Sequence, residues 1–83
     1  MKIKLEKYCG ENANKITIGE LELYFSYDTL VGFSSPSFGL VVSKNYFTKT
    51  TGKHIDAISK VGRVTDEKFS EELNKLTDRY FNF

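Results

Sequence analysis

The stretch TLVGFSSPSFGLVV, residues 29–42, holds two β-rich runs around a cluster of turn formers. Branched and aromatic side chains dominate residues 29–33 and 38–42, and Ser34-Ser35-Pro36-Ser37 separates them. This pattern predicts a β-hairpin with a four-residue loop. Because both runs are almost continuously apolar, we expect them to form the central strands of an antiparallel sheet.

Further strands are predicted before this hairpin, where apolar residues alternate with polar ones at the period of a half-buried strand. The phase of the alternation slips at Gly19, which predicts a tight turn or a bulge there. The apolar positions of these segments are Ile3, Leu5, Ile16, Ile18, Leu21, Leu23 and Phe25.

An amphipathic helix is predicted over residues 65–80. Phe69, Leu73, Leu76 and Tyr80 recur at spacings of four, three and four, which place them on one helical face. Thr65 is the expected N-cap. The chain is therefore predicted to be a single α+β domain over residues 1–83, with an antiparallel sheet of four or five strands and this helix packed on one face. The expected core combines the helix residues Phe69, Leu73 and Leu76 with Ile16, Leu23, Val31 and Leu40.

Residues 43–64 give two interpretations. Ile55 and Ile58 suit a short helix that begins near Thr50 or Thr51, whereas Ile55 and Ala57 suit a strand equally well. A short helical turn is the preferred interpretation.

The composition indicates a globular protein without recognisable catalytic groups. Of the 83 residues, 40% are hydrophobic and 28% charged, which is ordinary for a folded domain. Cys9 is the single cysteine and His54 the single histidine, so neither a disulfide nor a histidine- or cysteine-based metal cluster is expected. Charged and apolar residues alternate at the N-terminus and no long apolar run follows, so we expect a cytoplasmic protein that does not enter a membrane. Because no catalytic cluster is recognisable, we expect that it is not an enzyme and has no cofactor.

The charge is distributed unevenly along the chain. Residues 44–63 contain five basic residues against Asp56 alone, a net charge of +4, while the segments before and after are slightly acidic. An anionic partner would be attracted to this middle segment.

The candidate functional surface is the stretch from Lys44 to His54. Its end, Thr50-Thr51-Gly52-Lys53-His54, resembles a phosphate-binding loop but lacks the spacing of one. Hydroxyl and lysine side chains beside an aromatic residue are nevertheless suited to hold an anionic group. His54 is expected to orient the turn through a ring-nitrogen hydrogen bond; the alternative is that the threonines only cap a helix. The predicted binding residues are Lys44, Tyr46, Lys49, Thr50, Thr51, Lys53 and His54.

Two motifs resemble a domain-of-unknown-function family of short phage and plasmid proteins. The first is SYDTLVGF, residues 26–33, and the second is TTGKH, residues 50–54, preceded by Tyr46 and Phe47. The resemblance covers residues 26–64. It implies a phage-type accessory protein and supplies no catalytic residues.

The sequence is compatible with three classes of function. The preferred hypothesis is a non-enzymatic phage or mobile-element accessory protein that acts by binding a bacterial host protein or ribonucleoprotein, with an inhibitor of a defence system such as CRISPR–Cas as its narrower form. The alternative is a nucleic-acid-binding module that uses residues 44–63. A small enzyme is the least favoured class. Weak homodimerisation through the aromatic tail, residues 80–83, is also expected.

Overall fold

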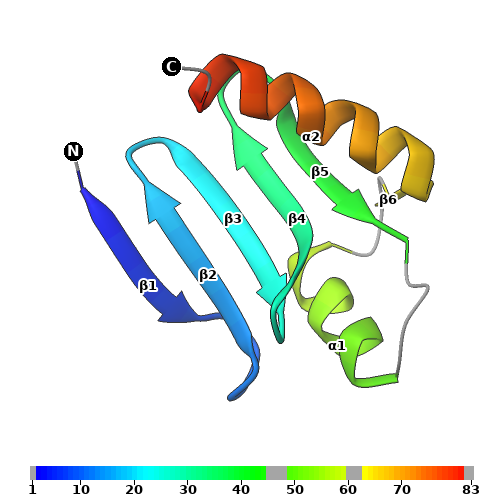
Figure 1. The fold of residues 1–83 in the computed structure, drawn as a ribbon. Helices are drawn as coiled ribbons and strands as arrows, with labels where there is room; N and C mark the ends of the chain where they lie inside the picture. Colours follow the sequence, from blue (N-terminus) through cyan, green and yellow to red (C-terminus); the bar gives the residue numbers. More distant parts are fainter. Residues whose placement is uncertain (1, 45–48, 60–62, 82–83) are drawn as a thin grey trace.

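The computed structural model describes residues 2–44, 49–59 and 63–81, with only the backbone of Lys49 (Figure 1). Within these ranges, six strands form one sheet in chain order, and the elements are β1 (Ile3–Lys7), β2 (Ala13–Ile18), β3 (Leu21–Ser26), β4 (Thr29–Ser35), β5 (Gly39–Ser43), α1 (Lys49–Ile58), β6 (Arg63–Val64) and α2 (Asp66–Tyr80). The first five strands pair antiparallel, and β6 pairs parallel to β5.

The predicted α+β class and the C-terminal helix are confirmed. The prediction of four or five antiparallel strands is wrong in two respects, because the sheet has six strands and its last pair is parallel. The sixth strand has only two residues, too few to give a periodic sequence signal. It becomes parallel because α1 carries the chain back along the sheet, as a crossover helix does in a β-α-β unit. Of the two interpretations of residues 43–64, the helical one is confirmed by α1, although the helix begins one residue before Thr50.

Glycines with a positive φ lie at the connections between β2 and β3 and between β4 and β5. Gly19, at a positive φ of 62°, lies in the two-residue turn between Ile18 and Leu21, as the slip in the alternation predicted. The β4–β5 hairpin closes more tightly than expected, because Ser35 pairs with Gly39 and leaves a loop of three residues, 36–38. Gly39, the first residue after this loop, has a φ of 70°, a left-handed conformation that glycine adopts without strain.

The helix α2 covers one face of β3, β4 and β5 (Figure 1). Thr65 is its N-cap, as predicted, and accepts a hydrogen bond from the Lys68 backbone N–H at 3.3 Å. Phe69 and Leu76 are buried against the sheet, and each contributes about 1.5–3 kcal/mol through this burial. The core also contains Leu21, Phe33 and Val41, with Leu23, Leu30, Phe38, Val64, Leu73 and Tyr80 packed around it.

A second, smaller core lies on the opposite face, beneath α1. Successive residues of a strand point to opposite faces, so Val42 lies under α1 when its neighbour Val41 lies under α2. Val31 joins Val42, Ile55 and Ile58 there.

Two of the predicted core positions are therefore wrong. The pairing of β3 with β4 shifts from Gly32 opposite Tyr24 to Leu30 opposite Phe25, so Val31 is the extra residue of a bulge and faces α1. Leu40 pairs with Ser34 on the face of α1 but beyond its reach, and is 45% exposed. Leu23 packs in the predicted core, whereas Ile16 is only half-buried beside it.

Candidate functional site

The predicted binding residues do not form one exposed loop. Most of the TTGKH motif lies in α1, where Thr50 and Lys53 are exposed while Thr51 and His54 are buried. Lys44 is exposed after β5; Tyr46 lies outside the described residues, and of Lys49 only the backbone is described. The motif therefore divides into a solvent side and a side that faces the sheet.

The buried side of the motif makes a chain of hydrogen bonds to the end of β3. The Ser26 hydroxyl donates to Thr51 Oγ1 at 3.0 Å, and His54 Nδ1 lies 2.7 Å from the same Ser26 oxygen. Ser26 therefore joins the Thr51 hydroxyl and the His54 ring in one buried hydrogen-bond chain. The expected ring-nitrogen hydrogen bond of His54 is thus present, but it joins α1 to β3 instead of holding a surface turn.

This serine–histidine pair is enclosed. Ser26 is 2% exposed and His54 5%. A nucleophilic serine must meet its substrate, and the Ser26 oxygen is covered by α1 and the sheet. The cluster is best described as an internal anchor for α1.

Tyrosine rings surround His54. The Tyr8 ring centroid lies 6.4 Å from that of His54 and 5.3 Å, edge-on, from that of Tyr24, while the Tyr27 ring lies 5.9 Å from His54. The Tyr8 hydroxyl donates to the Phe25 carbonyl at 2.9 Å. Burial, with smaller contributions from Cys9 and Tyr24, raises the pKa of Tyr8 to about 12. No local pattern predicted this cluster, because its members are far apart in the sequence.

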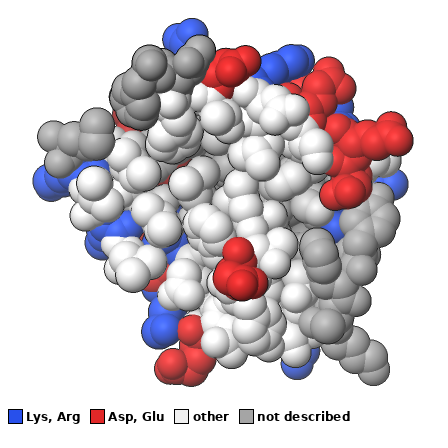
Figure 2. Space-filling view, viewed as in Figure 1, with Lys and Arg blue, Asp and Glu red and all other residues white. Residues whose placement is uncertain are grey.

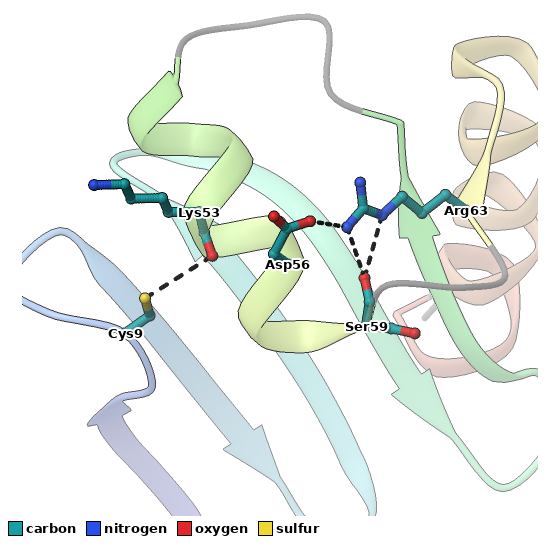
Figure 3. A network of polar contacts seen from close by, with 5 residues as sticks. All are labelled: Cys9, Lys53, Asp56, Ser59 and Arg63. Carbon is teal, nitrogen blue, oxygen red and sulfur yellow. Dashed lines mark hydrogen bonds and ion pairs between the residues drawn. The ribbon is translucent and has the colours of Figure 1, made fainter.

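The other end of α1 is fixed by Arg63 (Figure 3). Its guanidinium forms an ion pair with Asp56 and donates two hydrogen bonds to the Ser59 carbonyl, at 3.2 Å from Nε and 3.0 Å from Nη2. A separate contact joins α1 to the loop before β2, where the Cys9 thiol lies 4.0 Å from the Lys53 carbonyl oxygen. One of the five basic residues counted in the middle segment therefore has a structural role that links β6 to α1.

The first half of the sheet, β1 and β2 with the adjoining side of β3, has one charged face and one apolar face. On the charged face, Lys15 lies 3.3 Å from carboxylate oxygens of both Glu6 and Glu22, and Lys4 lies 3.7 Å from Glu6. Burial alone would lower the pKa of Lys15, but its hydrogen bonds to Glu22 and Glu6 more than offset this, and the pKa is raised. Lys15 also lies 5.8 Å above the ring of Tyr24. The charges of this face compensate one another.

The opposite face is apolar, and neither described helix covers its β1 and β2 part. Ile3 and Leu5 are 70% and 69% exposed, and Ile16 and Ile18 are half-buried beside them. Figure 2, seen from the side of α2, shows a broad uncharged area with most charged side chains at its margin. A groove of about 320 Å³ is formed there by Leu5, Asn14, Ile16, Phe25, Tyr27 and Asp28. We call these residues, together with Ile3 and Ile18, the open apolar face.

Tyr27 stands at the end of this face in a strained conformation. It is the first residue of the two-residue β3–β4 turn, with a φ of 58°, where glycine is usual. A left-handed backbone costs a residue with a side chain about 1–2 kcal/mol. Tyr27 is nevertheless half exposed and is among the residues that line the groove, while its ring packs 5.9 Å from that of His54. Sequence periodicity could have indicated the apolar positions, but only the structure shows that no helix covers them.

Comparisons with known proteins give a family without an assigned activity. The model of DUF8033, described as a family of unknown function, matches residues 3–75, and the chain belongs to this family. The predicted membership of a domain-of-unknown-function family is thereby confirmed, over a longer segment than its motifs indicated. Neither the curated proteins nor the solved structures gave a match. Within the described ranges, no helix is long and apolar enough to cross a membrane, and no group of three potential metal ligands occurs.

Proposed function

We propose that this DUF8033 member acts by binding a protein partner on the open apolar face. The observation that carries the proposal is the exposure of Ile3 and Leu5 on the same face as a groove formed by Ile16, Phe25 and Tyr27. Contiguous apolar surface of this kind marks interaction sites in soluble proteins, because exposing it to water is unfavourable.

The chemistry of this face favours a protein surface over nucleic acid. A phosphate backbone is held by lysine and arginine, and the groove is lined by no basic residue. Of the basic segment, Arg63 is paired with Asp56, which leaves Lys44 and Lys53 as its exposed cations among the described residues. Binding of nucleic acid through residues 44–63 is therefore the second candidate.

The conformation of Tyr27 also supports the proposal. Backbone strain is concentrated at functional positions, where a side chain is needed at a place that the backbone does not favour. Tyrosine is enriched in protein interfaces because it offers a large rigid surface together with a hydroxyl. The strained turn places an exposed tyrosine at the end of the sheet that bounds the groove.

The resemblance to short phage and plasmid proteins suggests the setting of this binding. An accessory protein of a phage or mobile element would meet its partner, a host protein or ribonucleoprotein, in the bacterial cytoplasm. Inhibition of a defence system such as CRISPR–Cas is the narrower form of this proposal. It needs only a stoichiometric binder, and a groove lined by apolar residues and Asp28 suits a protein component of such a system better than its nucleic acid.

The test compares two exposed leucines on opposite faces of the sheet. Partners are captured from bacterial lysate with the tagged wild-type protein and identified by mass spectrometry. The Kd of the purified partner is then measured for the wild type, for Leu5→Thr and Tyr27→Asn, and for the control Leu40→Thr. Truncating a central interface residue costs more than 1 kcal/mol, so we expect Leu5→Thr and Tyr27→Asn each to weaken binding about 5-fold or more. Leu40→Thr should bind as the wild type does.

Thermal unfolding accompanies the binding measurements. Exposed substitutions usually change stability by no more than about 0.5 kcal/mol, and asparagine tolerates the left-handed conformation of residue 27. If Leu5→Thr and Tyr27→Asn bind normally while Lys49→Ala with Lys53→Ala abolishes binding, the basic segment is the functional surface and the proposal is wrong. Nuclease-sensitive capture would point to the nucleic-acid alternative.

A further inference from the structure

The outer edge of β1 is a second unpartnered surface, distinct from the open apolar face. β1 is the first strand of the sheet, so one of its sides has no neighbouring strand among the described residues. The Lys2 carbonyl accepts from the Gly19 N–H and the Tyr8 N–H donates to the Ala13 carbonyl, so even-numbered residues face β2. Because these groups alternate in an antiparallel ladder, the N–H and C=O groups of Ile3, Leu5 and Lys7 point outward.

This edge has the form of a pairing template. β1 contains no proline, glycine or bulge over its five residues, and its register with β2 is unbroken. Lysines on an edge strand usually discourage association by repulsion. Here Glu6 lies on the same face as Lys4, so the charges along the edge change sign.

In one register only, Lys4 and Glu6 pair with each other and no like charges lie opposite one another. If Leu5 of one copy pairs antiparallel with Leu5 of another, Lys4 lies opposite Glu6 of the second copy, and the reverse pair forms by symmetry. A shift by two residues places Lys4 opposite Lys4, or Glu6 opposite Glu6. A shift by one residue would join the apolar face of one copy to the charged face of the other.

We propose that two copies of this protein associate through antiparallel pairing of their β1 edges, with Leu5 opposite Leu5 and Lys4 opposite Glu6. The charged pairs are then the non-hydrogen-bonded ones, whose side chains lie closest. The twofold axis is perpendicular to the sheet, so both open apolar faces lie on the same side of a twelve-stranded sheet, twice the number in one copy. This inference does not depend on the proposed function: Leu5 belongs to both surfaces, but the pairing uses its backbone, and Lys4 and Glu6, which determine the register, lie outside the groove.

Sedimentation equilibrium over a concentration series up to the millimolar range tests the pairing. The wild-type mass should rise with concentration from 9.5 kDa toward twice that value, because a single strand pair forms a small interface and a weak dimer. Lys4→Glu and Glu6→Lys should each remain monomeric, since each replaces two attractive pairs by two repulsive ones. Two recoveries are expected: the double variant should associate again, and an equal mixture of the two single variants should form heterodimers.

Each further outcome has a defined meaning. A wild-type protein that remains at 9.5 kDa throughout, or single variants that associate as well as the wild type, would overturn the proposal. Lys4 is largely exposed, so Lys4→Glu is expected to keep the fold even if Glu6→Lys, which places a lysine beside Lys15, does not. Amide exchange gives an independent readout: the Ile3, Leu5 and Lys7 amides of the wild type should become protected at high concentration and remain unprotected in Lys4→Glu.

Discussion

At the scale of single residues, the TTGKH motif shows how the same residue types serve two purposes. Thr50 and Thr51 are identical in chemistry, yet one is exposed and the other joins a buried hydrogen-bond chain with Ser26 and His54. Sequence reasoning could identify the motif as unusual, because hydroxyl, lysine and histidine side chains gather there. It could not tell which residues of the motif are buried, because the sequence did not show which side of the helix faces the sheet.

Tyr8 gives a prediction of pH dependence. Its pKa is about 12 in the folded protein against 10.0 in an unperturbed tyrosine, so the unfolded chain loses its proton first as the pH rises. Stability is unaffected by this group below pH about 10 and falls as the pH rises from about 10 to about 12. Tyr8→Phe should therefore lose about 1 kcal/mol near neutral pH, through the lost hydrogen bond to the Phe25 carbonyl, and show a shallower alkaline decline.

Urea unfolding at a series of pH values measures both effects. Tyr24, whose pKa burial and Glu22 also raise, leaves a residual slope in the variant. Parallel stability curves for the wild type and Tyr8→Phe above pH about 10 would show that Tyr8 ionises equally well in the folded protein.

At the scale of elements, α1 is held at both ends by polar contacts. Near its start, Thr51 and His54 bond to Ser26, and past its end the Ser59 carbonyl accepts from Arg63. These contacts supplement a small apolar contribution, because within α1 only Ile55 is fully buried in the smaller core, with Ile58 packed against it. Glycine in the helix interior, at Gly52, lowers its intrinsic stability further. The position of α1 therefore depends on hydrogen bonds more than that of α2 does.

Adjacent threonines measure this dependence. Thr51→Ala removes the acceptor of the Ser26 hydroxyl inside the protein and should destabilise it by about 1–3 kcal/mol relative to Thr50→Ala. Both substitutions give the same gain in helix propensity, so their difference reports the buried surroundings of Thr51, both its hydrogen bonding and its packed methyl group. Equal unfolding midpoints in urea for the two variants would contradict an anchoring role of Thr51.

The elements also show which parts of the fold a sequence can predict. The α2 helix combines four regularly spaced apolar residues with an N-cap, and its bounds matched the prediction. β6 and the bulge at Val31 were missed because each is decided by the pairing of one strand with another, not by periodicity within a strand. The open apolar face was missed for a related reason: alternation predicts an apolar face, but only the path of the chain determines whether a helix covers it.

At the scale of the whole molecule, one sheet separates two cores. α2 with Phe33 and Leu21 forms the larger core, and α1 with Val31 and Val42 the smaller one on the other face. The two share strands β4 and β5 but no buried side chain. Both helices therefore lie over the later strands, on opposite faces of the sheet, while β1 and β2 remain without a covering helix (Figure 1). The proposed binding face and the proposed dimer edge both belong to this uncovered side.

Two cores on one sheet predict additive destabilisation within a single cooperative transition. Leu76→Val and Ile55→Val each remove one buried methylene, from the larger and smaller core respectively, and should each cost about 1 kcal/mol. Because the sheet backbone separates the two sites, the double variant should lose the sum of the two costs within about 0.5 kcal/mol. The shared strands should keep the urea transitions followed by far-ultraviolet circular dichroism and by tyrosine fluorescence coincident. An interaction energy well above that limit would show that the cores are coupled through the strands, and separated transitions would show that α1 unfolds independently of α2.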